Sequence, residues 1–139
     1  MEEEEEGVKC LDTAVLIDLT RDLPSAVQAV GEALAGGAVT TEVNAFELYS
    51  GAHERGRQVP RDFAAVEKIL RRVDVLPLNR RASIRGAEIA SLLRSRGQDV
   101  GGLDVLIAAI AMSHGINTIV TEDADDFRRI PGLHVETYR

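Results

Sequence analysis

The stretch Val8-Lys9-Cys10-Leu11-Asp12-Thr13-Ala14-Val15-Leu16-Ile17-Asp18 decides the fold class, because a short apolar run gives way at Asp12-Thr13 to an amphipathic one. The first part is typical of a buried strand, and the apolar spacing of the second predicts a helix. Asp12 then stands at the carboxyl end of the strand.

The same alternation continues along the chain. Further strands are expected over 38–41, 73–78 and 117–120, and a fifth is expected to start at 133–135. Helices are expected from Pro24 to Gly36-Gly37, from Glu42 (capped by Thr41) to about Arg55, around 63–70, over 82–96 and over 103–114, with one helical turn within 123–129. Gly56 and Pro60 are expected to bracket a loop. In the helix over 82–96 the predicted inward residues are Ile84, Ala87, Ile89, Ala90, Leu92 and Leu93.

Strands that alternate with helices favour a parallel sheet covered on both faces. We therefore predict an α/β fold, a three-layer α/β/α sandwich whose central parallel sheet has about five strands. A chain of 139 residues suits a single domain. Residues 1–7 are predicted to be an acidic, disordered tail, and 8–139 one globular domain.

The composition indicates in which cellular compartment the protein is expected to act. The chain has no apolar run of transmembrane length and no signal-peptide pattern, and its one cysteine excludes an internal disulfide. We expect a cytoplasmic protein that does not bind membranes. The net charge is −7, but the run Glu2 to Glu6 carries five negative charges and the remainder is −2. Arginines crowd the middle third, where they suit either phosphate contacts or plain solvation of helix faces.

Four acids fall near the predicted carboxyl edge of the sheet: Asp12, Glu47, Asp104 and Asp123. Active sites of open parallel sheets lie at that edge. An acid among apolar neighbours is costly to bury unless it is paired or bound to a metal ion. If the four converge, their repulsion calls for a divalent cation, and oxygen-only ligation favours Mg²⁺ or Mn²⁺.

Each acid also has an ordinary structural explanation. Asp12 and Asp104 would suit helix N-caps, Glu47 a solvated helix edge, and Asp123 a turn. Glu42 competes with Glu47, but it lies in a first helical turn, where an acid favours the helix dipole. The scattered histidines His53, His114 and His134 do not suggest a metal triad, and Cys10 suits packing inside its strand.

The acids lie in four motifs that resemble those of PIN-domain proteins, especially the VapC-type toxins of bacterial and archaeal toxin–antitoxin pairs. In chain order the motifs are Leu11-Asp12-Thr13-Ala14-Val15-Leu16-Ile17-Asp18, then 40–52 around Glu47, then 102–111 around Asp104, and 120–133 around Asp123. Each motif alone is weak, but the four together cover almost the whole chain at suitable spacing.

The resemblance implies an Mg²⁺- or Mn²⁺-dependent endoribonuclease with Asp12 and Asp104 as main ligands and with Glu47 and Asp123 binding directly or through water. The closing motif leaves open which of its residues contact the metal, so Thr121 and Asp126 are secondary candidates. Thr13 is a further secondary candidate. It also implies an RNA substrate, a VapB-like antitoxin and a homodimer.

Other classes fit less well. A phospho-accepting receiver domain needs a lysine near a late strand end, and the only lysines are Lys9 and Lys68. A haloacid-dehalogenase-type phosphatase would have a second aspartate at the position of Ala14. A PIN-type processing nuclease that is not a toxin, and a non-catalytic PIN interaction module, remain as alternatives.

Overall fold

The fold is built on one parallel sheet of five short strands. The computed structural model describes residues 7–21, 23–54 and 59–138. The strands are β1 (Lys9–Leu11), β2 (Ala38–Thr41), β3 (Asp74–Leu76), β4 (Thr118–Val120) and β5 (His134–Glu136), and their order across the sheet is β3-β2-β1-β4-β5. All four neighbouring pairs are parallel, so the five-stranded parallel sheet predicted from the sequence is confirmed.

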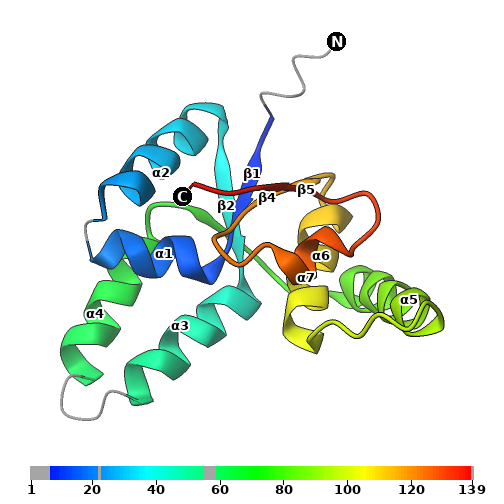
Figure 1. Cartoon of the computed structure of the whole chain (residues 1–139). Helices are drawn as coiled ribbons and strands as arrows, with labels where there is room; N and C mark the ends of the chain where they lie inside the picture. The colour runs from blue at the N-terminus through cyan, green and yellow to red at the C-terminus, as the bar shows by residue number, and fades with distance from the viewer. Residues whose placement is uncertain (1–6, 22, 55–58, 139) are drawn as a thin grey trace.

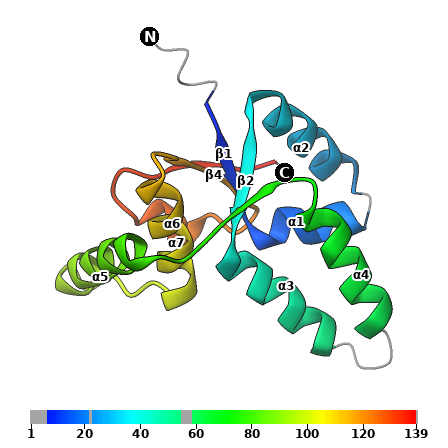
Figure 2. The same ribbon diagram turned by 180° about the vertical axis from the view of Figure 1, so that it is seen from behind.

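Helices cover both faces of this sheet, as Figures 1 and 2 show from opposite sides. They are α1 (Thr13–Thr20), α2 (Pro24–Gly36), α3 (Glu42–Glu54), α4 (Val59–Leu70), α5 (Arg80–Ser95), α6 (Gly102–Ser113) and α7 (Asp125–Arg128). One core lies between the sheet and α5, α6 and α7, and the other between the sheet and α1, α2 and α4, with α3 contributing to both. The three-layer α/β/α arrangement is therefore confirmed.

Strand pleating distributes consecutive residues between the two cores. Cys10 and Ile119 face the core with α6, whereas Leu11 and Val120 face the core with α1 and α2. All four side chains are buried. Because both faces of each central strand are covered, these strands read as continuous apolar runs, which is typical of parallel sheets.

Local signals set most of the helix boundaries. Pro24 is the first residue of α2, where its missing N–H costs nothing. The Thr41 hydroxyl accepts a hydrogen bond from the backbone N–H of Asn44 (3.2 Å), so Thr41 caps α3 as predicted. The Asn79 side chain caps α5 by accepting from the N–H of Ala82 (2.9 Å). Helix α5 therefore starts two residues before the predicted position.

One expectation about the middle of the chain was wrong, and one predicted strand is shorter than expected. Pro60 does not close a loop but lies in the first turn of α4, a position that proline tolerates; its predicted partner Gly56 lies outside the described residues. The predicted strand over 73–78 is confined to β3, since Pro77 cannot donate a ladder hydrogen bond.

The inward face of α5 was also partly misassigned. The residues that it buries are Ala82, Gly86, Ile89 and Leu93, at spacings of four, three and four. Ile84 is 55% exposed and Leu92 38% exposed, although both were predicted to face inward. The helix turns Gly86 toward α6, and that choice of face carries Ile84 and Leu92 outward.

The predicted tail, residues 1–7, lies almost entirely outside the described residues. Among the helices of the described ranges, none is both long and apolar enough to cross a membrane.

Gly86 allows α5 and α6 to approach closely, which yields a test of the packing. A Cβ at this position would lie 3.3 Å from Leu106 Cδ2 and 3.5 Å from Ala109 Cβ. Gly86→Val is expected to lower the free energy of unfolding by about 2 kcal/mol, because overpacking a core costs about 1–3 kcal/mol. Gly31→Ala in α2 is the matched control: its new Cβ would meet nothing within 4 Å. It should stabilise the protein by roughly 0.5–1 kcal/mol. Urea unfolding measures both, and equal effects would contradict the packing described.

Candidate active site

Asp12 stands at the end of the central strand and is the most buried of the candidate acids. Its backbone N–H donates to the carbonyl of Val120 (3.0 Å), which continues the pairing of β1 with β4. The side chain is only 7% exposed. Desolvation by burial raises the pKa of Asp12, and the nearby charge of Glu47 adds to this, while hydrogen bonds from Thr121, the Thr13 backbone and Asn44 oppose it.

Both carboxylate oxygens of Asp12 accept hydrogen bonds from buried side chains. The Thr121 hydroxyl, just after β4, donates to Oδ2 (2.7 Å), and the Asn44 amide, on α3, donates to Oδ1 (3.2 Å). Three different segments of the chain therefore meet at this carboxylate. Its orientation is fixed from both sides.

Glu47 is connected to the same network through Thr13. The Thr13 hydroxyl donates to Glu47 Oε1 (2.5 Å) and accepts from the Asn44 amide (2.9 Å). Glu47 is partly buried, so the solvated helix edge that the sequence left open does not describe it. Thr13, a secondary candidate, therefore contacts Glu47 directly.

Thr121 links Asp12 to the loop that carries Asp123. It is fully buried, and its hydroxyl accepts from the backbone N–H of Asp123 (3.0 Å) while donating to Asp12. The Asp123 side chain itself is exposed. Thr121 thus fixes the backbone of Asp123 relative to the side chain of Asp12.

Asp104 lies in the first turn of α6, on the side of the sheet that α5, α6 and α7 cover, and it is half-buried. Its pKa is raised to about 6, first by desolvation and then by the negative charges of Asp12, Asp126, Glu47 and Asp123. Only carboxylates that lie close together repel one another in this way. Asp104 therefore lies within electrostatic range of the other three predicted acids and of Asp126.

The ordinary explanations for these acids find little support. Asp12 occupies the N-cap position of α1, but its side chain makes no capping hydrogen bond. Among the described residues, neither Asp12, Glu47, Asp104 nor Asp123 forms an ion pair. By contrast, Asp126 lies 3.6 Å from the guanidinium of Arg129, and Glu42 is exposed. Asp126 therefore has a basic partner of its own.

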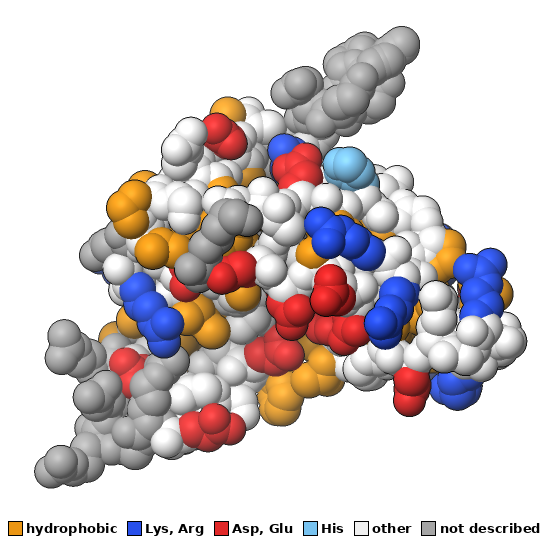
Figure 3. All heavy atoms as spheres, in the orientation of Figure 1, with side chains coloured by type: hydrophobic (Ala, Val, Ile, Leu, Met, Phe, Trp, Pro, Cys, Tyr) orange, Lys and Arg blue, Asp and Glu red, His pale blue; other side chains and the backbone are white. Residues whose placement is uncertain are grey.

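Acidic side chains gather on one face of the molecule. Figure 3 shows acidic side chains clustered around the position of α7, with basic side chains next to them. Within the described ranges, no three His, Cys, Asp or Glu side chains are arranged so that they could hold a metal ion as they stand. The site is thus a cluster of unpaired carboxylates with an oxygen-only donor set, not a preassembled cage.

Two features of this region escaped the sequence reasoning. Asn44 is fully buried and contacts Asp12 and Thr13, and the signal for it was a polar residue three positions after the capping Thr41. The other is Asp18, which is buried and accepts from the hydroxyl of Tyr138 (2.5 Å). No local pattern connects residues 120 positions apart.

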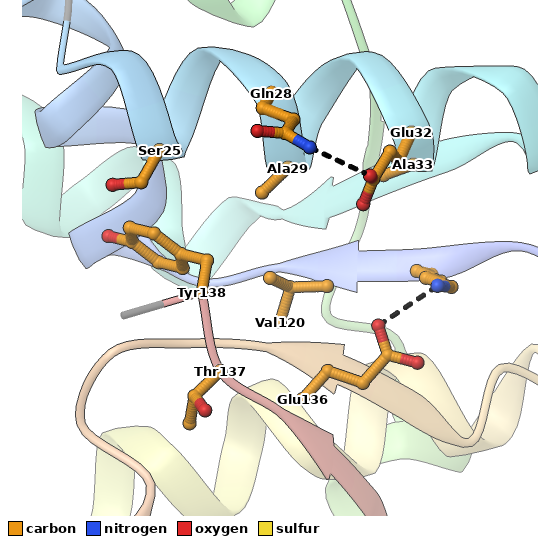
Figure 4. Close-up of a pocket in the computed structure, with 10 residues that line it drawn as sticks. Ser25, Gln28, Ala29, Glu32, Ala33, Val120, Glu136, Thr137 and Tyr138 are labelled. Atoms are coloured by element: carbon orange, nitrogen blue, oxygen red, sulfur yellow. Dashed lines mark hydrogen bonds and ion pairs between the residues drawn. The ribbon is translucent and has the colours of Figure 1, made fainter.

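A pocket of about 210 Å³ lies elsewhere, between α2 and the segment that follows β5 (Figure 4). Its polar side chains pair with each other: Lys9 Nζ lies 2.9 Å from Glu136 Oε1, and Gln28 donates to Glu32 (3.3 Å). None of the four acids lines it. The pocket therefore does not belong to the acidic site.

The repulsion at Asp104 predicts a conflict between stability and charge. A carboxyl whose folded pKa lies above its unfolded value destabilises the fold as pH rises through that interval, here from about 4 to about 6. Asp104→Asn should therefore stabilise the metal-free protein near pH 7.5, by about 1 kcal/mol after allowing for solvent screening of a half-exposed group. Near pH 4.5 the gain should shrink. Thermal unfolding in a chelator measures both, and a loss of stability at pH 7.5 would contradict the clustering.

Comparison with known proteins gives a consistent result. The PIN domain matches residues 9–133. The chain is 31% identical to the tRNA(fMet)-specific endonuclease VapC of Shigella flexneri, over 92% of this chain and 96% of that protein. It is 27% identical to ribonuclease VapC2 of Haemophilus influenzae, with the same coverage.

Solved structures agree with the sequence matches. A chain of DNA-bound VapBC from Salmonella typhimurium superposes with a TM-score of 0.84 at 28% identity, covering 96% of this chain and 99% of that one. A chain of VapBC2 from Rickettsia felis, at 19% identity, superposes with a TM-score of 0.86 over 95% and 99% of the two chains and shows the shared fold. The four motifs, the sheet order and these matches lead to one assignment: the chain belongs to the PIN-domain family.

Proposed function

We propose that this protein is a divalent-metal-dependent endoribonuclease that acts as the toxin of a toxin–antitoxin pair. The observation that carries the proposal is the set of four carboxylates, Asp12, Glu47, Asp104 and Asp123, gathered at the carboxyl edge of the sheet without a basic partner among the described residues. The relatives named as VapC endonucleases and ribonucleases support it.

The chemistry of the donors fits a hard divalent cation. The four side chains offer only oxygen, and among the described residues none of them forms an ion pair with a basic side chain. Mg²⁺ and Mn²⁺ prefer such ligands, so we propose one of them as the cofactor. Asp12 and Asp104 would be the main ligands, with Glu47 and Asp123 binding directly or through water.

The chain's own contribution is to hold these acids in place and to bind RNA. Bound metal would supply an activated water and offset charge on the phosphate. Thr121 and Asn44 fix the two oxygens of Asp12, and Thr13 fixes Glu47, so these two acids are oriented before substrate arrives. The neighbouring Arg128 and the arginines of α5 are exposed and suit phosphate contacts.

Substitutions that remove the charge of an acid but keep its shape test the catalytic assignment. Asp12→Asn and Asp104→Asn should each lower the rate of RNA cleavage by about a hundredfold or more, because metal catalysis contributes several kcal/mol and each 1.4 kcal/mol is tenfold. Asp125→Asn is the matched control: Asp125 is exposed at the start of α7, close in sequence to Asp123, and is not among the charges that act on Asp104. Cleavage by Asp12→Asn at the wild-type rate with Mg²⁺ or Mn²⁺ would refute the proposal.

The names of the relatives also suggest substrate and partner. Transfer RNA is the first RNA to test, since the Shigella relative is named for tRNA(fMet). The solved VapBC structures support a VapB-like antitoxin as the cognate partner. A cytoplasmic site of action and a homodimer belong to the same proposal. A processing nuclease on the same scaffold is the second candidate, and the family match alone favours it equally.

Expression in bacteria separates toxin from processing enzyme. Induction of the wild-type chain should lower the colony count at least about tenfold, because RNA cleavage without a bound antitoxin stops translation. Induction of Asp12→Asn should leave the colony count unchanged. Co-expression of a small antitoxin encoded beside the gene should restore growth. Normal growth with active, undegraded enzyme in the cell would favour the processing nuclease.

A further inference from the structure

Asn44 occupies a position at which one side chain has two distinct sets of contacts. It is the third residue of α3 and is completely buried. Its carbonyl Oδ1 accepts from the Thr41 hydroxyl (2.7 Å) and from the Thr41 backbone N–H (3.3 Å). Its amide Nδ2 donates to Asp12 Oδ1 and to Thr13 Oγ1 (3.2 and 2.9 Å). One end of the side chain thus serves the helix cap, and the other faces the acids.

The chemistry of these groups fixes the direction of every hydrogen bond. The Thr41 N–H can only donate, and the Asp12 carboxylate, when ionised, can only accept. A flipped amide would set its oxygen against Asp12 and its NH₂ group against the Thr41 N–H, so only the observed orientation satisfies both ends. Since Thr13 accepts from Asn44, its single proton is free to go to Glu47.

We infer that Asn44 is a positioning residue that sets the mutual placement of Asp12 and Glu47 for metal binding. This inference rests on the proposed function of the acidic site. The two amide protons connect Asp12, at the end of β1, with Thr13, which in turn donates to Glu47 on α3. They do so without adding charge. The neutral amide orients the carboxylates without placing a positive charge beside them that would compete with a cation, which is the role that outer contacts play around metal ligands.

A purely structural role is the competing explanation, because the contacts with Thr41 form a reciprocal cap at the start of α3. That role would affect stability and leave metal binding alone. Asn79 offers a matched control, since it caps α5 through Ala82 and, among the described residues, makes no hydrogen bond to the acids. Asn79→Ala removes an asparagine cap without touching the site.

The experiment measures Mn²⁺ binding by electron paramagnetic resonance in wild type, Asn44→Ala, Asn44→Ser and Asn79→Ala, with Asp12→Asn as the reference for loss of a ligand. Both Asn44 variants remove the amide donors, and serine keeps a small polar group in case alanine prevents folding. Circular dichroism confirms that each variant is folded. We expect the Mn²⁺ dissociation constant to rise about ten- to hundredfold in the Asn44 variants. Asn79→Ala should lose thermal stability with unchanged Mn²⁺ affinity.

Cleavage assays add a second readout. In the Asn44 variants the Mn²⁺ concentration needed for half-maximal cleavage should rise in step with the dissociation constant, while the KM for RNA stays unchanged. A double-mutant cycle with Thr13→Val should be non-additive, because both changes break the same connection to Glu47.

Three outcomes are distinguishable. Weaker Mn²⁺ binding in folded Asn44 variants, but not in Asn79→Ala, supports the inference. Unchanged Mn²⁺ affinity in a folded Asn44 variant overturns it and leaves the proposed function standing. Absence of Mn²⁺ binding in the wild type overturns the proposed function, and this inference falls with it.

Discussion

The structure depends on holding a buried carboxylate, that of Asp12, at the end of its central strand. Asp12 is almost completely buried, and burial alone would favour its neutral form. Hydrogen bonds from Thr121 and Asn44 oppose that tendency and come from two neighbouring segments, one after β4 and one on α3. Elements far apart in the sequence are thereby fixed around one functional group, and the parallel sheet supplies the scaffold that brings them together.

Mutual repulsion is the second constraint. Asp104 faces four other acids, and the chain tolerates this arrangement with little basic compensation among the described residues. Natural proteins accept unfavourable charge clusters mainly where function requires them. The two threonines and the asparagine around Asp12 and Glu47 bear on the same problem, because they add hydrogen-bond donors without cancelling charge.

The sequence predicted the layers and the strand pattern well because these follow from apolar periodicity. Asp12, Glu47 and Asp123 were proposed because they follow or lie near strand ends, and Asp104 because it lies in the first turn of an apolar helix. The resemblance of four motifs to one family supported the choice. The face of α5 was mistaken because composition ranks Ile84 and Leu92 above Gly86 as core residues, whereas close helix packing selects the residue without a side chain. Asn44 and the Asp18–Tyr138 contact were missed because their partners are set by tertiary structure, which no local spacing reveals.

The long-range pairing of β1 has a consequence for how the protein is made. Strand β1 is bonded on one side to β4, and Asp12 receives a hydrogen bond from a residue 109 positions later. On a ribosome, Asp12 is synthesised 109 residues before Thr121, so its surroundings cannot close until Thr121 has emerged. Contacts of such high sequence separation form slowly. The nascent chain therefore carries no assembled acidic site before that point.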